Sequence, residues 1–276
     1  MGTEDGFSPE KPQLPLENVP IIGKQIKDLA HKIDQTVATE GLSSGIKRTL
    51  EQRGAQIGVR YDSTVTSDYL HQSGKPLIVI STHSSVAEPL VVLSALSQDT
   101  EKPRDDIKAI VADALIGYPH LSRYFLPLYN TVSENLHRPK SLGGGEHIDP
   151  RKAARLNIEN LNLAATELKN GKLIFISPEG QLPKDSPWSS AGIGRLITNI
   201  GMGSNGHIIF ADAKGVNKLE LGKLINPLKS PKPFQNTLVN FSQPLSIDEI
   251  ISANGNRNGI TSDLNHRYND WIKTHR

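Results

Sequence analysis

The sequence predicts an α/β fold with a mainly parallel central sheet flanked by helices, preceded by a helical extension at the N-terminus. Three runs of apolar, mostly branched residues have the length of buried strands: LIVIS (77–81), LIFIS (173–177) and HIIFA (207–211). Runs without alternation need cover on both faces of a sheet, as parallel strands have. Helical periodicity separates these runs, most clearly over residues 150–169. The alternation of strands and helices therefore predicts the fold class.

The N-terminal part divides into a tail and two helices. Residues 1–19 are rich in proline and have no apolar period, which predicts a flexible tail. Over residues 22–37 the apolar positions step by four and three, which marks one face of a helix that Gly41 ends. A second, weaker helix follows. We expect a helical extension over residues 20–57 and an α/β domain over residues 58–276.

The remaining elements follow from short patterns. Asp149 at the N-cap and Pro150 at the first helical position open the longest helix of the domain. Residues 115–128 suggest mixed helix and loop, and residues 133–149 a long polar loop or insertion. The expected strands are 59–65, 77–81, 105–111, 173–177, 207–211 and 237–241. The expected helices are 22–37, 46–57 with a break near Gly54, 86–96, 150–169, 192–200, 247–251 and 264–275.

The composition excludes several classes of site. The chain has 276 residues and no cysteine, which excludes disulfides, thiolate zinc sites, iron–sulfur clusters and a cysteine nucleophile. With 31 Lys plus Arg against 29 Asp plus Glu, the net charge of +2 argues against a protein that mainly binds nucleic acid. No apolar run approaches the roughly 20 residues of a membrane span. The N-terminus lacks the features of a signal peptide.

Two short motif matches fail on their context. Residues 41–45 read GLSSG, which fits a nucleophile elbow around Ser43, but a helix precedes the serine where the elbow needs a strand. Residues 201–206 read GMGSNG, but this glycine string follows a helix and precedes a strand, the reverse of a dinucleotide site. A loop is the simpler interpretation of the second string. A serine esterase that uses Ser43 remains a competing hypothesis, testable with a fluorophosphonate probe.

His83 lies where a buried strand gives way to a helix. In open α/β sheets this edge binds ligands. Glu88 follows five residues later in the first helical turn, from which its carboxylate can reach back to the imidazole, fix its tautomer and raise its basicity. The pair then constitutes a general base and the group that orients it. The alternative is a structural histidine beside a helix-cap carboxylate.

Glu179 and Gly180 lie at a second strand end. Strand 173–177 leads into Pro178, which stops further ladder bonding, and then into Glu179 and Gly180. Glu179 is thereby held where it can bond a ligand hydroxyl or brace a loop. An ordinary strand-to-loop exit is the alternative.

Together these segments resemble the glycerol-phosphate and lysophosphatidate acyltransferase family. HSSVAEPLVVL (83–93) stands for the family's His-x-x-x-x-Asp motif and SPEG (177–180) for its Phe-Pro-Glu-Gly motif. VNFSQPLS (239–246) looks like the family's final strand and turn, so the resemblance covers roughly residues 58–275. It departs at Glu88, where aspartate is usual, at Ser177, where phenylalanine is usual, and at residues 181–182, where Gln-Leu replaces Thr-Arg.

The resemblance implies an O-acyltransferase. His83 would take the proton of a glycerol-phosphate or lysophospholipid hydroxyl, which attacks the thioester of acyl-CoA or acyl-carrier protein, with Glu88 steadying the imidazolium. The substrate-binding residues would be Ser84, Glu179, Gly180 and a cation, Arg151, with Arg138 and Lys140 as rivals. No metal and no cofactor beyond the thioester co-substrate are implied. A non-catalytic lipid-binding relative of the same fold is the alternative.

Lipid substrates imply attachment to a membrane surface. We expect a cytoplasmic protein, peripheral on the inner face of a membrane, with no nucleic-acid partner. The helix over 22–37 carries Lys24, Lys27 and Lys32 and could lie among lipid headgroups or pack against the domain. A second candidate surface is basic and apolar, and could also receive an acidic carrier protein. It comprises Lys214, Lys218, Leu219, Leu221, Lys223, Leu224, Lys229, Lys232 and Phe234.

Overall fold

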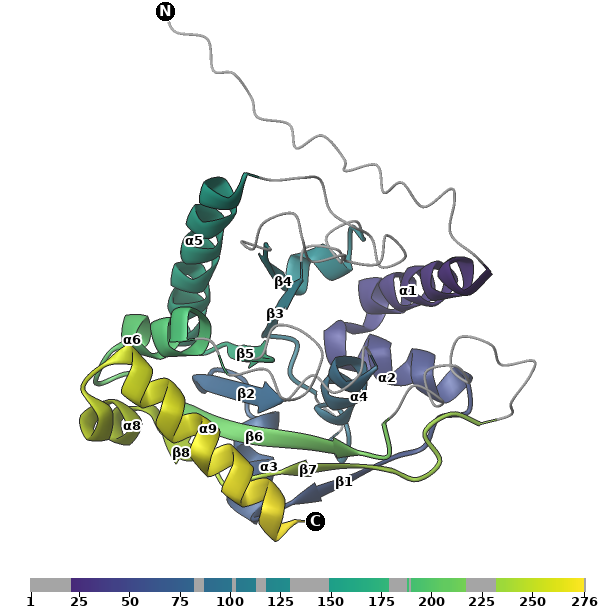
Figure 1. The fold of residues 1–276 in the computed structure, drawn as a ribbon. Coiled ribbons are helices and arrows are strands. Elements are labelled where there is room, and N and C mark those ends of the chain that lie inside the picture. The colour runs from purple at the N-terminus through teal and green to yellow at the C-terminus, as the bar shows by residue number, and fades with distance from the viewer. Residues whose placement is uncertain are drawn as a thin grey trace, which may run out of the picture.

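The computed structural model describes residues 21–81, 87–100, 103–112, 118–129, 149–178, 188, 190–216 and 232–275. Their strands form one sheet in the order β1-β7-β6-β2-β5-β3-β4, with β8 paired to β6 (Figure 1). The strands are β1 (Ile57–Tyr61), β2 (Leu77–Ser81), β3 (Ile107–Ala112), β4 (Phe125–Leu128), β5 (Leu173–Ile176), β6 (His207–Lys214), β7 (Thr237–Phe241) and β8 (Leu245–Ser246). The helices are α1 (Ile21–Glu40), α2 (Leu42–Gln52), α3 (Thr64–His71), α4 (Glu88–Ala95), α5 (Pro150–Lys169), α6 (Arg195–Ile200), α8 (Ile247–Asn254) and α9 (Arg257–Thr274). A 3₁₀ turn, η2 (Leu121–Tyr124), and a π turn, η4 (Ser190–Gly194), complete the elements.

The centre of the sheet is parallel, as the buried runs predict. β2 pairs in parallel with both β5 and β6, and β3 pairs in parallel with both β5 and β4. β7 runs antiparallel to β6 and parallel to β1, so β7 and β1 form a reversed edge. The predicted α/β class with a mainly parallel central sheet is therefore confirmed.

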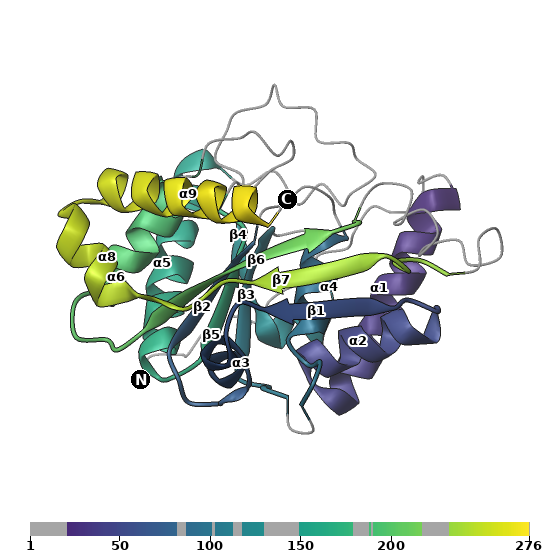
Figure 2. The same ribbon diagram turned by 90° about the horizontal axis from the view of Figure 1, so that it is seen from below.

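Helices cover both faces of the sheet (Figure 2). On the face that we call the α4 face, α1, α2 and α4 pack against alternate strand residues such as Val79 and Phe175. On the opposite face, the α5 face, α5, α6, α8 and α9 pack against the intervening residues, such as Ile78 and Ile176. Residues of α1 and α2 thus belong to the same core as the central strands. The predicted division at residues 20–57 and 58–276 is not tested by a separate observation.

Local sequence signals account for several helix boundaries. The Asp149 carboxylate accepts hydrogen bonds from the backbone N–H of Arg151 (2.9 Å) and Lys152 (3.1 Å), as predicted for the N-cap of α5. Gly41, with φ of 81°, separates α1 from α2. Gly45 allows α2 to approach α1, because a Cβ at this position would lie 2.6 Å from the backbone nitrogen of Val37.

A buried arginine ties the amino ends of three strands together. The Arg104 side chain is fully buried and makes a bidentate pair with Asp106, at 2.7 and 2.8 Å. Its guanidinium also donates to the backbone carbonyls of Tyr69, Lys75 and Gly171, at 3.3, 3.1 and 2.9 Å. These carbonyls lie just before β2 and β5 or in α3. Arg104 therefore gives these three carbonyls a buried hydrogen-bond donor.

Three sequence predictions are wrong at the level of elements. The strand expected over 59–65 ends at Tyr61, because Ser63 caps a helix, α3, by accepting a bond from the Thr66 N–H at 3.3 Å. Ile57 begins β1 and does not extend the second helix. Part of the stretch 115–128 is an edge strand, β4, paired in parallel with β3. Its sequence, FLPL, contains a proline that only an edge strand tolerates.

The apolar face of α1 packs against the domain. Leu29, Ile33 and Val37 are each at most 4% exposed. Asp34, at 3% exposed, accepts backbone N–H bonds from His120 (2.9 Å) and Leu121 (2.8 Å) and so caps η2. The predicted alternatives for this helix were a place among lipid headgroups and packing against the domain. The described side chains of α1 pack against the domain, and the side chains of residues 21–26 are not described. Within the described residues, no helix combines the length and the apolarity needed to cross a membrane.

The structure also bears on the two short motif matches, residues 41–45 and 201–206, and on part of the predicted basic and apolar surface. Ser43 lies in α2 at 1% exposed, with its hydroxyl facing the Arg104 carbonyl at 3.5 Å, so it is no nucleophile elbow. Gly201 ends α6 with φ of 74°, and the glycine string is a loop before β6. In the expected basic and apolar surface, Phe234 is 1% exposed and belongs to the core, which corrects its assignment. Residues 217–231 of that surface, the tail 1–19 and most of the loop 133–149 lie outside the described residues.

Candidate functional site

The two strands that lead into the sequence motifs lie side by side. β2 and β5 are parallel neighbours, with Ile80 opposite Ile176. On the other side of β2, Ser81 lies opposite Ala211 of β6. The carboxyl ends of these strands therefore meet at one edge of the sheet, the position where open α/β sheets bind ligands. We refer to it as the carboxyl edge.

The segments that carry the predicted chemistry start from this edge. Residues 82–86 directly follow β2, and residues 179–187 follow β5 after two further residues. His83, Ser84, Glu179 and Gly180 lie outside the described residues, so their roles stay predictions.

Glu88 is the first residue of α4 and is 1% exposed. Ala87 before it is fully buried, and Pro89 occupies the first turn, where its missing N–H costs no helical bond. The positive end of the helix dipole favours a carboxylate at this position. A carboxylate is seldom so deeply buried unless it is paired, so the place of Glu88 at the start of α4, five residues after His83 in the sequence, agrees with an internal role.

A serine ends β2, and another serine directly follows β5, on the same face of the sheet. Val79 of β2 and Phe175 of β5 face α4, so by alternation Ser81 and Ser177 face it as well. Ser81 is 0% exposed. The Ser177 hydroxyl oxygen is buried and has no hydrogen-bond partner within the described part of the chain. Neither serine was predicted as a site residue, although the shared ending of LIVIS and LIFIS was the available signal.

A second polar pair lies near the same edge on the α5 face. Asp212 of β6 is 7% exposed and lies opposite Asn240 of β7, which is 1% exposed. The side-chain nitrogen of Asn240 is buried without a hydrogen-bond partner. Sequence reasoning missed both residues, because a polar residue inside an apolar strand run gives no periodic signal of its own.

Arg151 lies at the start of α5 and is exposed. The C-terminal end of α5 leads into the amino end of β5. The N-terminal end of α5, which carries Arg151, therefore lies on the carboxyl side of the sheet. A helix of 20 residues is about 30 Å long, whereas a strand of four residues spans about 13 Å. Arg151 thus stands on a projecting helix end. The rival cations, Arg138 and Lys140, lie outside the described residues.

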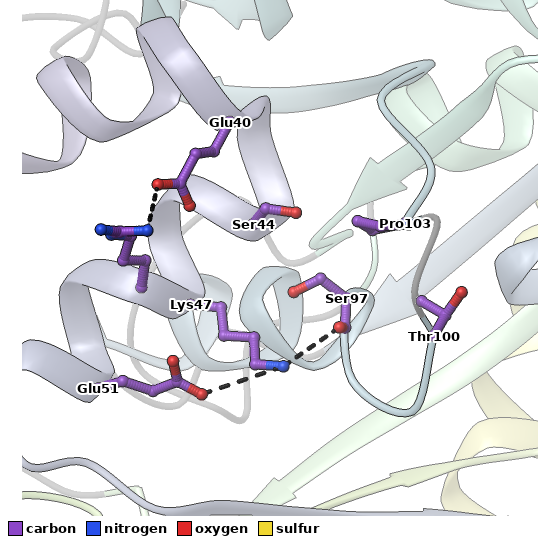
Figure 3. Close-up of a pocket in the computed structure, with 8 residues that line it drawn as sticks. Glu40, Ser44, Lys47, Glu51, Ser97, Thr100 and Pro103 are labelled. Carbon is purple, nitrogen blue, oxygen red and sulfur yellow. Dashed lines mark hydrogen bonds and ion pairs between the residues drawn. The ribbon is translucent and has the colours of Figure 1, made fainter.

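A small cavity lies elsewhere, between α2 and the turn after α4 (Figure 3). Its volume is about 260 Å³. Its charged groups are already engaged: Arg48 with Glu40 at 2.9 Å, and Lys47 with the Ser97 carbonyl at 3.3 Å and Glu51 at 4.0 Å. Since the α4–β3 connection runs along the amino edge of the sheet, this cavity is not the predicted site. Its lining residues are Glu40, Ser44, Lys47, Arg48, Glu51, Ser97, Thr100 and Pro103.

Comparison with known proteins finds a structural likeness but no matching family model or curated sequence. No protein-family model matches the chain, and no curated protein sequence matches it. Among solved structures, the chain is similar to the crystal structure of the 1-acyl-sn-glycerophosphate (LPA) acyltransferase PlsC from Thermotoga maritima. The two share 14% sequence identity with a TM-score of 0.46, over 90% of this chain and 80% of that one.

Proposed function

We propose that the protein is an O-acyltransferase that moves a fatty acyl group from a thioester to a hydroxyl of glycerol phosphate or a lysophospholipid. The observation that carries the proposal is the pairing of β2 with β5. This pairing sends the His83 segment and the Glu179 segment out of adjacent parallel strands at one edge. A general base and a carboxylate that hold the same small acceptor must lie near each other, because the base has to come within about 3 Å of the acceptor hydroxyl.

In the proposed reaction, the His83 imidazole accepts the proton of the acceptor hydroxyl while its oxygen attacks the thioester carbonyl. The tetrahedral intermediate collapses and expels the thiolate of CoA or of a carrier protein, which takes the proton from the imidazolium and leaves as the thiol. Products are an ester and a free thiol. Glu88, buried at the start of α4, orients and stabilises the imidazolium. General base catalysis of this kind contributes roughly 10²–10⁴-fold, and positioning supplies the rest.

The acceptor would be held by Ser84, Glu179 and Gly180. Arg151 would contact its phosphate, since a guanidinium offers paired donors to phosphate oxygens. The exposure of Arg151 on a projecting helix end suits a contact with a headgroup at a membrane surface. We also propose peripheral membrane attachment on the cytoplasmic side.

The test is a transferase assay with purified protein. Palmitoyl-CoA or palmitoyl-carrier protein is offered with glycerol 3-phosphate or lysophosphatidate, and the ester product is measured by mass spectrometry. We expect His83→Ala to abolish turnover. His266→Ala is the matched control, because His266 is exposed on α9 and pairs only with Asp270 at 3.1 Å among the contacts described. Full activity of His83→Ala would refute the mechanism.

The competing function is that of a non-catalytic lipid-binding protein. Glu88 motivates it, because its side chain is one methylene longer than aspartate. It predicts that the wild-type protein binds lysophosphatidate or sediments with vesicles of anionic phospholipid, yet forms no ester with either donor.

A further inference from the structure

The Ser177 hydroxyl is buried and unsatisfied. Its oxygen is buried although the residue as a whole is partly exposed, and among the described residues it has no hydrogen-bond partner. Burial without a partner costs free energy, because the hydroxyl gives up its bonds to water and gains nothing in return. Such groups are rare in folded proteins, and each calls for a physical explanation.

The location of Ser177 is the carboxyl edge of the central strands. It directly follows Ile176, the last residue of β5, and β5 lies between β2 and β3. Since Ile80 and Ile110 are both opposite Ile176, the next residues of the neighbouring strands, Ser81 and Val111, flank Ser177. All three face the side of the sheet on which α4 begins.

The backbone holds the hydroxyl at this place. β5 fixes the chain before Ser177, and Pro178 after it is buried. A residue before proline is confined to extended conformations. These neighbours hold the Ser177 hydroxyl beside the end of β5.

We propose that Ser177 is a substrate-binding residue whose hydroxyl bonds an oxygen of the acyl acceptor's polar head. This inference rests on the function proposed above. His83 and Glu179 each follow one of the two serines, Ser81 and Ser177, by two residues in the sequence. An acceptor hydroxyl near the proposed base would therefore lie close to Ser177. A hydroxyl can donate and accept, which suits an alcohol or phosphate oxygen and does not suit an acyl chain.

The test compares Ser177→Ala with Ser94→Ala. Ser94 is a matched control, because it is also fully buried but its hydroxyl donates to the Val91 carbonyl at 2.7 Å within α4. For Ser177→Ala we expect the KM for the acceptor to rise about tenfold, equivalent to roughly 1.4 kcal/mol. The kcat and the KM for the acyl donor should stay within twofold of wild type. Ser94→Ala should leave all three constants unchanged.

Thermal unfolding without acceptor separates binding from a structural role. Ser177→Ala removes an unsatisfied group, so its melting temperature should equal or exceed that of the wild type. Ser94→Ala removes a bond that is made, so its melting temperature should fall. A lower melting temperature for Ser177→Ala, an unchanged KM for the acceptor, or an effect confined to kcat or to the donor would overturn the proposal.

Direct binding distinguishes this proposal from the proposed function. Calorimetric titration with glycerol 3-phosphate, and with lysophosphatidate in micelles, is carried out on the wild type and on both variants. If the wild type transfers no acyl group but loses affinity for either acceptor on Ser177→Ala, the acyltransferase assignment fails and the Ser177 assignment stands. If the wild type binds neither acceptor at millimolar concentration, the Ser177 assignment is also overturned.

Discussion

The Asp62 carboxylate joins the end of β1 to the end of α9 through His275. Oδ1 of Asp62 lies 2.8 Å from Nε2 of His275, and Oδ2 accepts the indole N–H of Trp271 at 2.7 Å. The two partners, Asp62 and His275, are 213 residues apart in the sequence. The Trp271 ring also packs near Phe210, with ring centroids 6.1 Å apart, so the contact fixes the last turn of α9 over the α5 face.

We expect Asp62→Ala to lower the free energy of unfolding by about 1–3 kcal/mol, because it leaves half-buried donors on both Trp271 and His275 without a partner. Asp62→Asn should cost less, since the amide oxygen still accepts the indole N–H. Urea denaturation measures both. Asp270→Asn on the exposed side of α9 is the control and should leave the midpoint unchanged. Equal midpoints for Asp62→Ala and the wild type would contradict the role of this contact.

Arg104 should be among the most sensitive positions for stability. Arg104→Ala removes the cationic partner of Asp106 and the donor to three backbone carbonyls, and we expect the free energy of unfolding to fall by about 3–5 kcal/mol. Arg104→Lys should also be strongly destabilised, because an ammonium cannot reproduce the bidentate fork. Chemical denaturation is the measurement. Arg267→Ala removes an exposed pair with Asp263 (2.9 Å) and should cost at most about 1 kcal/mol. A lysine variant as stable as the wild type would rule out the geometric argument.

Glu88 provides a test of the proposed base and its orienting group. Glu88→Gln keeps the shape but removes the negative charge, so we expect kcat to fall by about 10² or more. Glu88→Asp retains a carboxylate and should keep measurable turnover. Circular dichroism controls for folding, because Glu88 is 1% exposed. If the glutamine variant turns over as fast as the wild type, Glu88 does not orient the base.

His71 should make the fold sensitive to acid. Its pKa is lowered from 6.5, chiefly because burial disfavours the charged ring. Below pH 6.5 the unfolded chain therefore binds a proton that the folded chain does not, so the free energy of unfolding falls as the pH falls, by at most about 1.4 kcal/mol per pH unit for each such group.

His71→Phe keeps a ring beside Tyr61, whose centroid lies 6.0 Å away, but does not titrate. Urea denaturation between pH 7 and pH 5 should show a shallower pH dependence for this variant. His207, whose pKa is also lowered mainly by burial, should account for part of the slope that remains. An unchanged slope in His71→Phe would contradict this assignment.

The fold class and most elements could be predicted because their signals are local. The buried runs that became β2, β5 and β6 are readable from apolar residues without alternation, and the start of α5 from Asp149 and Pro150. α3 and β4 could not be read in the same way. The Ser63 cap competes with an alternating pattern, and FLPL is recognisable as a strand only beside β3.

For the candidate site, the sequence by itself determined which short segments follow the buried strands and that Glu88 lies in a first helical turn. Only the tertiary structure decided that β2 and β5 are neighbours in register, that Ser177 carries a buried hydroxyl without a partner, and that Asp212 faces Asn240 across two antiparallel strands. The physical reason is the distance along the chain over which each kind of interaction acts. Caps and periodicities act over about four residues along the chain, whereas strand order, burial and contacts such as Asp62 with His275 arise when distant segments pack around one core.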